Sequence, residues 1–159
     1  MTRNKSISPD IGFIPTPQDA LEVMLKLAAI APDDVVYDLG SGDGRLLIQA
    51  AQRYGVRGVG VDIDPARVEE GRSLAAQAGV GDRVLFRVGN LYDEPFNDAT
   101  VVFIYLLPHL NLRLRPRLRQ LRPGTRVVSH QFDMGDWEPE RVVKLPDSEE
   151  ESTVYLWRI

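Results

Sequence analysis

The chain of 159 residues contains no cysteine and only two histidines, His109 and His130. Without cysteine it has no disulfide, no thiolate ligand for a metal and no cysteine nucleophile. Two histidines far apart in the sequence do not predict a histidine-based metal centre, so we expect no metal. The chemistry must therefore come from a cofactor or from carboxylates.

Long apolar segments are also absent. The sequence has no run of about 18 apolar residues, the length that predicts a membrane-spanning helix. It shows no charged segment followed by an apolar one at its start, so we predict no signal peptide and a cytoplasmic location. The formal net charge of −4 argues against general binding to nucleic acid.

The patterning predicts one domain over residues 1–159, in which strands and helices alternate. A helix is predicted after the cap Thr16 and Pro17, so residues 1–31 are expected to form an N-terminal flap and helix. Two more helices are predicted at 46–54 and 65–78, and strands are predicted up to Asp38 and at 56–62, 84–88, 100–106, 126–132, 141–145 and 153–159. We therefore expect an α/β fold with a doubly wound, mostly parallel seven-stranded sheet and a C-terminal antiparallel hairpin.

The region before the fifth predicted strand combines a leucine stripe with a basic tract. Leu114, Leu118 and Leu121 predict a helix, with Pro116 in its first turn. Six arginines form the basic tract, and no acid lies between positions 99 and 132: Arg113, Arg115, Arg117, Arg119, Arg122 and Arg126. The tract is either a solvated helix face or a docking surface for an acidic protein segment, an anionic membrane face or RNA.

The most informative segment is VYDLGSGDGR at positions 36–45. An apolar strand ends in Asp38 and is followed by Gly40, Gly42 and Gly44. Glycine accepts positive φ and lets a ligand approach bare backbone. The G-x-G-x-G spacing differs from the G-x-G-x-x-G of dinucleotide sites, and the Asp38 carboxylate would repel a pyrophosphate. Because a carboxylate suits a cation, we predict a site for S-adenosylmethionine (SAM), which carries an ammonium and a sulfonium.

This segment resembles motif I of the class I SAM-dependent methyltransferases, and Val59-Gly60-Val61-Asp62 is similar to the acidic end of their second strand. The resemblance implies that Gly40, Ser41 and Gly42 bind the amino-acid part of SAM through the backbone, while Asp38 binds its ammonium. It also implies that Asp62 accepts hydrogen bonds from the ribose hydroxyls and that Ile63 packs on the adenine.

The chain departs from this family after its third and fourth strands. Asn90 stands where relatives carry an aspartate that binds the adenine amino group, and its amide oxygen is still an acceptor. We expect Asn90 and Leu91 at the adenine, the alternative being that Asn90 is an ordinary turn residue. The sequence IYLLP at 104–108 replaces the acid-Pro-Pro-aromatic sequence of amine-methylating relatives.

Tyr105 and Pro108 are the candidate catalytic residues. Tyr105 lies at the predicted strand tip where the methyl group is presented, and its hydroxyl or neighbouring carbonyls would orient an amine lone pair. The alternative is that Tyr105 is a core aromatic. His130 and Asp133, at the end of the fifth strand, are candidate bases, and the alternative for His130 is a structural role.

Four segments make the chain similar to the small protein-lysine methyltransferases that act on the ATP synthase c subunit and the adenine nucleotide translocase: FIPTP at 13–17, DLGSGDGR at 38–45, IYLLP at 104–108 and RVVSHQFDMGDW at 126–137. This similarity implies a protein substrate, transfer to a lysine amine by direct SN2 displacement, and S-adenosyl-L-homocysteine as product. Those relatives carry an apolar membrane-targeting segment at the N-terminus, which this sequence lacks. A small-molecule N- or O-methyltransferase and a non-catalytic SAM-binding protein are the alternatives.

The prolines of the FIPTP segment stiffen it just ahead of the first helix. We expect this segment to cross the cofactor pocket as a flap. Pro15 and Thr16 would then belong to the cofactor site, with Thr16 near the SAM carboxylate.

Overall fold

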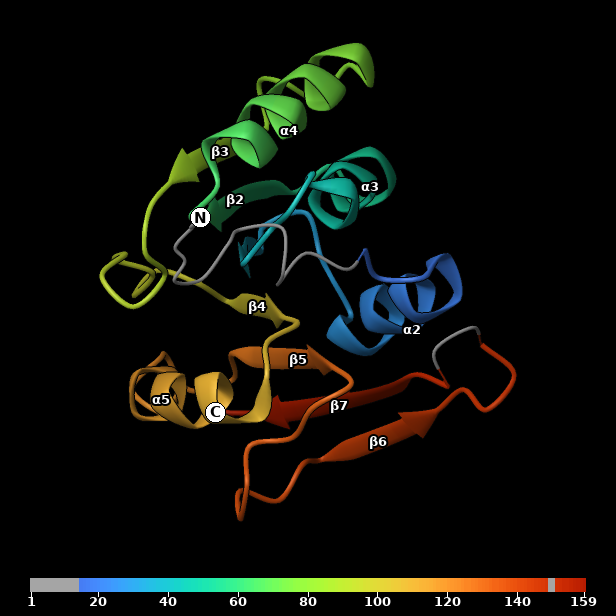
Figure 1. Ribbon diagram of the computed structural model, residues 1–159, viewed down its shortest axis with the longest axis vertical. Coiled ribbons are helices and arrows are strands. Elements are labelled where there is room, and N and C mark those ends of the chain that lie inside the picture. The colour runs from blue at the N-terminus through green and yellow to red at the C-terminus, as the bar shows by residue number, and fades with distance from the viewer. Residues whose placement is uncertain (1–14, 149–150) are drawn as a thin grey trace, which may run out of the picture.

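The computed structural model describes residues 15–148 and 151–159, which contain four helices and seven strands (Figure 1). The helices are α2 (Gln18–Ala28), α3 (Arg45–Tyr54), α4 (Pro65–Gln77) and α5 (Pro108–Leu118). The strands are β1 (Val35–Leu39), β2 (Arg57–Asp62), β3 (Val84–Val88), β4 (Val101–Ile104), β5 (Arg126–His130), β6 (Arg141–Lys144) and β7 (Thr153–Arg158). In this part of the chain no helix has the length and hydrophobicity needed to cross a bilayer.

All seven strands form one sheet in the order β3-β2-β1-β4-β5-β7-β6. Strands β1 to β5 are parallel to one another, whereas β7 is antiparallel to both β5 and β6. The predicted fold class is therefore confirmed, including the antiparallel hairpin at the C-terminal end. The strand order reverses between β1 and β4, which is the switch point where open α/β sheets bind their ligands.

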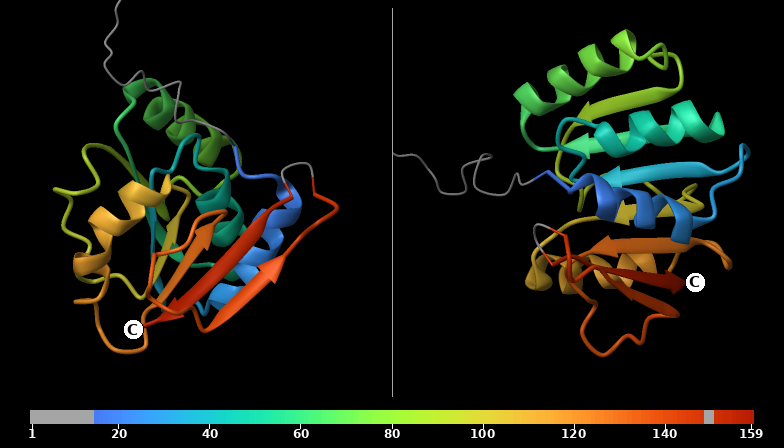
Figure 2. Two further views of the ribbon diagram at one scale, coloured as in Figure 1. Left: turned by 60° about the horizontal axis from the view of Figure 1, so that its bottom comes forward. Right: turned by 90° about the vertical axis from the view of Figure 1, so that its right-hand side faces the viewer.

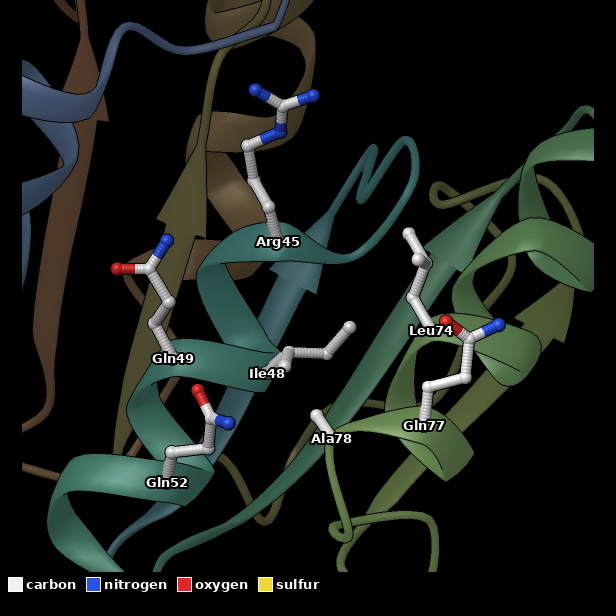
Figure 3. A pocket seen from close by; sticks show the side chains of 7 residues that line it. All are labelled: Arg45, Ile48, Gln49, Gln52, Leu74, Gln77 and Ala78. Carbon is white, nitrogen blue, oxygen red and sulfur yellow. The ribbon is translucent and has the colours of Figure 1, made fainter.

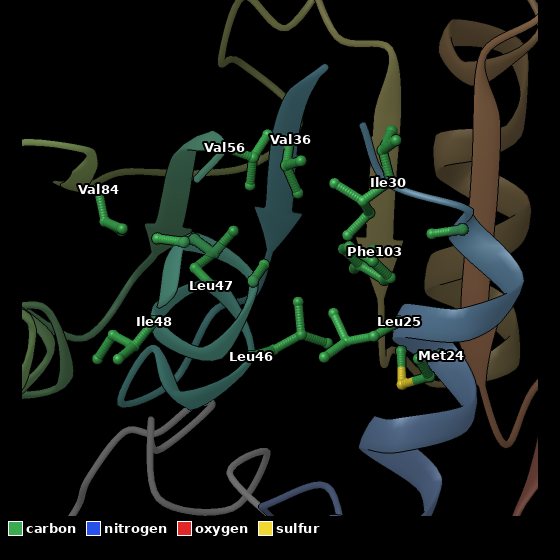
Figure 4. Packing of buried hydrophobic residues seen from close by; sticks show 14 of the residues in the cluster. Met24, Leu25, Ile30, Val36, Leu46, Leu47, Ile48, Val56, Val84 and Phe103 are labelled. Carbon is green, nitrogen blue, oxygen red and sulfur yellow. The ribbon is translucent and has the colours of Figure 1, made fainter. Parts of the chain in front are cut away.

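Helices cover the two faces of the sheet unequally (Figure 2). Helices α2, α3 and α4 lie on one face, and α5 lies on the other. On the three-helix face, Met24 and Leu25 of α2 and Leu46 of α3 pack with Phe103 of β4 in one apolar cluster (Figure 4). Each such leucine contributes roughly 1.5–3 kcal/mol by leaving water, so this layer fixes the strands that carry the site.

The opposite face has a second apolar cluster under α5. Leu114 and Leu118 are fully buried against it, and so is Trp157 of β7. The indole of Trp157 donates its N–H to the carbonyl of Trp137 at 2.8 Å, so this buried polar group is satisfied. All four residues of β4 are buried, as expected for a strand between two covered faces.

The starts of two helices test the capping predictions. Asp64 caps α4 as predicted, because its carboxylate accepts a hydrogen bond from the Ala66 amide at 2.9 Å. The prediction for Thr16 was wrong: Pro17 holds the N-cap position of α2, and no side chain caps that helix. Asp19 in the first turn instead accepts a hydrogen bond from the Ala20 amide at 2.8 Å.

Two further expectations were wrong. Pro116 lies in the last turn of α5 rather than the first, because Pro108 occupies the first helical position and the helix ends at Leu118. A late proline is tolerated here because the helix stops two residues beyond it, so few hydrogen bonds are disturbed. Strands and helices do not alternate throughout, since the segment between β3 and β4 forms turns only.

Candidate active site

The turn after β1 carries three glycines with positive φ: Gly40 at +88°, Gly42 at +58° and Gly44 at +81°. The amides of Gly40 and Ser41 both donate to the Val61 carbonyl of β2, at 2.7 and 3.0 Å. A Cβ on Gly44 would stand 2.4 Å from the ring of Phe86, so glycine is required there both by conformation and by space. The turn therefore presents bare backbone at the carboxyl edge of the sheet.

Asp62, at the end of β2, is joined to this turn. Its Oδ2 accepts a hydrogen bond from the Gly42 amide at 2.8 Å, and its Oδ1 accepts one from the Asp64 amide at 2.9 Å. The two acidic motifs predicted to share a ligand are thus in direct contact. Each carboxylate oxygen keeps a second lone pair that can accept from a ribose hydroxyl.

Asp38 lies inside β1 and is buried. Burial raises the pKa of its carboxyl well above the usual range, and the neighbouring charges of Asp62 and Asp43 raise the pKa further. Asp43 is paired with Arg45 at 2.7 Å. Within 15–148 and 151–159, the carboxyl of Asp38 is influenced only by burial and by the like charges of Asp62 and Asp43, and by no hydrogen bond or cation. A buried carboxylate with no partner suits a cation, so these residues fit the ammonium of SAM.

Ser41 points beneath the turn rather than toward a ligand. Its hydroxyl is buried without a hydrogen-bond partner in the described ranges, and a Cβ on Gly60 would stand 2.8 Å from its Oγ. Because Gly60 has no side chain, the Ser41 side chain fits against β2 beneath the turn. The Ser41 amide donates to the Val61 carbonyl and the Ser41 carbonyl accepts from the Gly44 amide, both at 3.0 Å. The backbone contact of Ser41 with the cofactor stays a prediction.

The residues predicted to surround the adenine lie at the ends of β2 and β3. The side chain of Ile63 is 65% exposed directly after Asp62, which leaves an apolar surface free for a flat ring. Asn90 accepts a hydrogen bond from the Tyr92 amide on its Oδ1 at 3.0 Å, so it stabilises its own turn. Leu91 is half-buried and packs on the second apolar cluster.

The ends of β4 and β5 form the other half of the site. The ring of Tyr105 meets the ring of His130 edge-on at 4.2 Å and stacks on that of Phe132 at 6.4 Å. Leu106, the next residue after Tyr105, is the nearest neighbour of Gly40, at 3.4 Å from its ideal Cβ position. In the pairing of β1 with β4, Leu39 lies beside Ile104, so Tyr105, the next residue, stands beside the glycine turn. Pro108 is exposed at the start of α5.

His130 is fully buried, and one ring nitrogen pairs with the Ser152 hydroxyl at 2.8 Å. Burial lowers the pKa of His130 to about 4, so the imidazole is neutral near pH 7 and is a weak base. Asp133 is exposed, and its Oδ1 accepts a hydrogen bond from the Gly135 amide at 3.1 Å. The alternative of a structural role for His130 fits this environment better than the role of base.

Pro15 is exposed and Thr16 is half-buried just before α2. The first two residues of the predicted flap, Phe13 and Ile14, lie outside the described residues. The flap and the contact between Thr16 and the cofactor stay predictions, as does the single domain over residues 1–159.

Most of the arginine tract is engaged within the chain. Arg117 donates to the carbonyls of Leu91 and Tyr92 at 3.2 and 2.7 Å and to that of Glu94. Arg126 pairs with buried Asp34 at 2.7 Å. The other engaged members are Arg113 over the Tyr92 ring, Arg115 paired with Asp136 and Arg119 over the Trp137 ring. Arginine spacing alone could not indicate these contacts, because every partner lies outside the tract.

A groove of about 360 Å³ runs between α3 and α4, lined by Ile48 and Leu74 and by three glutamine side chains (Figure 3). Only Arg45, at the start of α3, connects this groove to the glycine turn, so we assign it no part in the site. Within the described ranges, no three histidine or acidic side chains come together as a metal site.

The strand order and the acids at the ends of β1 and β2 define a class I SAM-dependent methyltransferase. Comparison with known proteins gives the family: residues 38–141 match the ANTKMT methyltransferase domain, and the chain belongs to this family. It is an enzyme that takes its methyl group from SAM.

Three relatives are informative. The chain is 41% identical over 156 residues to a protein-lysine N-methyltransferase of Saccharolobus islandicus, covering 97% of both chains. It is 31% identical over 133 residues to the lysine N-methyltransferase of Homo sapiens named for the ATP synthase c subunit, covering 83% of this chain and 56% of the human one. A crystal structure of an RNA methyltransferase from Salinibacter ruber with S-adenosyl-L-homocysteine is 53% identical, with a TM-score of 0.87, and covers 92% of this chain and 94% of that chain.

Proposed function

We propose that this methyltransferase transfers the methyl group of SAM to the side-chain amine of protein lysines. The observation that carries the proposal is the character of the acceptor side of the site. It would be built from the rings of Tyr105 and Phe132, and the adjoining histidine, His130, is buried with a pKa of about 4. An amine that has already lost its proton to water needs no base, whereas a hydroxyl acceptor does.

The 41% identity to a protein-lysine N-methyltransferase over nearly the full length of both chains supports the same acceptor. The Salinibacter relative is named as an RNA methyltransferase, so RNA is the outcome to be distinguished. The net charge of −4 favours protein over RNA, because RNA binding relies on an excess of accessible cations.

On the cofactor side, the residues present would hold SAM as follows. Gly40 and Gly42 would offer backbone beside the amino-acid part, Asp38 would receive the ammonium, and Asp62 would accept hydrogen bonds from the ribose. Ile63 would pack on the adenine, with Asn90 and Leu91 at its edge. Bound SAM supplies a methyl group on a sulfonium that is already activated, so the protein contributes mainly the alignment of the acceptor.

The reaction attaches the methyl group to the neutral amine by direct displacement, and the proton left on the product nitrogen passes to water. A free lysine has a pKa of about 10.4, so only a small fraction of the acceptor is reactive at pH 7. Tyr105 and Pro108 would provide an aromatic and apolar surface with backbone carbonyls rather than a base. We expect activity to rise with pH toward 9. Tyr105→Phe, which keeps the ring but removes the hydroxyl that would orient the amine lone pair, should slow transfer more than it weakens SAM binding.

The decisive experiment uses methyl-labelled SAM and an extract of the source cell. After transfer, the label is followed separately into protein, RNA and dialysable products, and labelled protein is hydrolysed to identify methyllysine. Label in methyllysine supports the proposal. Label in RNA or in small molecules contradicts it, and SAM binding without any transfer indicates the non-catalytic alternative. Asp62→Ala serves as the negative control.

Two further proposals concern the surroundings of the reaction. An acidic segment of the substrate would dock on Arg113, Arg119 and Arg122, the most exposed arginines of the tract. This is tested by Arg122→Glu, which should raise KM for an acidic protein substrate without changing SAM affinity. The cytoplasmic location stays a prediction.

A further inference from the structure

The chain makes a strained turn at the tip of β5. Gln131 has a φ of +77°, and the Phe132 amide donates to the His130 carbonyl at 3.0 Å across it. This is a γ-turn of the positive-φ kind, which is rare and strained for a residue with a side chain. Strained backbone persists only where the surroundings enforce it, and it gathers at functional sites.

Hydrogen bonds from the next strand enforce this turn. The Gln131 amide donates to the Thr153 carbonyl at 2.6 Å, and the Gln131 Oε1 accepts from the Thr153 amide at 3.0 Å. The residue is thereby paired with β7 through both its backbone and its side chain. A register shift that would relax φ would break both bonds.

The Phe132 carbonyl is held from the other direction. It accepts a hydrogen bond from the Ser129 hydroxyl at 2.6 Å and another from the Asn111 Nδ2 at 3.3 Å. Asn111 is fully buried in α5 and also donates to the Asp133 carbonyl at 3.1 Å. The backbone on both sides of the Phe132 ring is therefore fixed.

The turn delivers the Phe132 ring to the side of Tyr105. The two ring planes are 26° apart with centroids 6.4 Å from each other, and both side chains are half-buried. The rings form one continuous aromatic wall at the ends of β4 and β5. Leu39 of β1 is paired with Ile104 of β4, so the next residues, Gly40 and Tyr105, are neighbours at this edge of the sheet. The wall therefore adjoins the glycine turn, where we expect the methyl group to be presented.

We propose that Phe132 is a specificity-determining residue, which with Tyr105 forms the wall that receives the methylene stem of the acceptor lysine. This inference rests on the function proposed above. Four methylene groups pack well on ring faces, and a dry wall favours the neutral amine over the ammonium. In this arrangement Ser129 and Asn111 are positioning residues, which act through the turn.

The test compares Phe132→Ala and Phe132→Leu with the wild type on one protein acceptor that the wild type methylates. We expect Phe132→Ala to lower kcat/KM for the acceptor by roughly tenfold or more while the SAM Kd from calorimetry stays the same. Phe132→Leu keeps the apolar volume and should lose less. Ser129→Ala loses one hydrogen bond to the turn and should reduce acceptor kcat/KM by a smaller factor with the same SAM Kd. Leu85→Ala removes an exposed apolar side chain from β3 and is the matched control.

Three outcomes overturn the inference. If Phe132→Ala methylates the acceptor as the wild type does, the aromatic wall is not the acceptor site although the proposed function stands. If SAM affinity falls in parallel with acceptor kcat/KM, Phe132 belongs to the cofactor site instead. If the wild type labels no protein at all, the proposed function is wrong, and so is the proposal that the aromatic wall receives a lysine.

Discussion

The Gly42 amide donates to the Asp62 carboxylate at 2.8 Å, so the acid at the end of β2 shapes the turn that follows β1. We predict that Asp62→Ala weakens SAM binding by about 1.5–3 kcal/mol, because a charged acceptor is lost and the turn loosens. The SAM affinity of Asp62→Asn, which keeps one acceptor oxygen, should fall between those of the wild type and Asp62→Ala. Calorimetry measures the affinity for SAM, and thermal unfolding without ligand measures how much stability is lost when the turn loosens. An unchanged affinity in Asp62→Ala would place the ribose elsewhere.

Asp38 should destabilise the protein when no ligand is bound. Burial raises the pKa of its carboxyl, so the folded state holds the proton more tightly than the unfolded chain does. Stability is therefore lost as pH rises above the ordinary pKa of aspartate, near 3.9, toward the raised value. We predict that Asp38→Asn is more stable than the wild type at pH 7 and equally stable near pH 3. Denaturant unfolding at several pH values checks this, and a pH-independent difference would contradict it.

The same carboxyl should make SAM binding depend on pH. A cationic ammonium favours the ionised form of Asp38, so binding removes its proton and affinity rises with pH until Asp38 is ionised in the free protein. The calorimetric enthalpy should then vary with the ionisation enthalpy of the buffer. In Asp38→Asn affinity should be weaker and the buffer dependence smaller. Equal buffer dependence in the two proteins would show that the released proton comes from another group.

We predict that the buried His130 lowers the free energy of unfolding in mild acid. Its pKa is about 4 in the folded protein against 6.5 ordinarily, so the unfolded chain takes up the proton first as pH falls. The contribution of neutral His130 to the free energy of unfolding is fully present above pH 6.5. Roughly 2–4 kcal/mol is lost as the pH falls from there to 4. His130→Gln should lose this decline, whereas His109→Gln, at the exposed start of α5, is the matched control. Parallel curves for wild type and His130→Gln would exclude the buried imidazole as the cause.

Arg117 should support the adenine side of the site from a distance. Its guanidinium donates to the carbonyls of Leu91, Tyr92 and Glu94. A lysine cannot reproduce this fork of donors, so we predict that Arg117→Lys costs about 1–3 kcal/mol of stability. The same substitution should also weaken SAM binding, because the carbonyls that Arg117 binds directly follow Asn90, which we expect at the adenine. The control is Arg122→Lys on the exposed surface. Identical unfolding of the two variants would show that the contacts of Arg117 are dispensable.

The fold could be predicted because its signals are local. Three glycines at alternate positions and the Asp64 cap depend on the backbone conformations available to those residue types, so the sequence alone located the turn and the start of α4. The predicted order of elements then allowed few arrangements of a parallel sheet. The acids Asp38 and Asp62 followed from the same segments, and the structure brings them to one edge.

The acceptor side could not be predicted in the same way. The positive φ of Gln131 is imposed by Thr153, and the Phe132 carbonyl is held by Asn111 of α5. These partners are distant in the sequence, and no residue near Gln131 favours such a turn. Asn111 is a fully buried amide within α5, and the sequence alone does not indicate that this helical position is buried.

The contacts of Arg117 also limit what can be exchanged between related enzymes. The segment between β3 and β4 has no helix of its own, and its carbonyls are bonded to a side chain 23 to 26 positions further along the chain. If this loop were transplanted into a related enzyme, its carbonyls would have no hydrogen-bond donor unless the helix equivalent to α5 also carried an arginine at the matching position. The loop and α5 should therefore be exchanged together. Chimaeras that take them from different enzymes should first lose binding at the adenine end of the site.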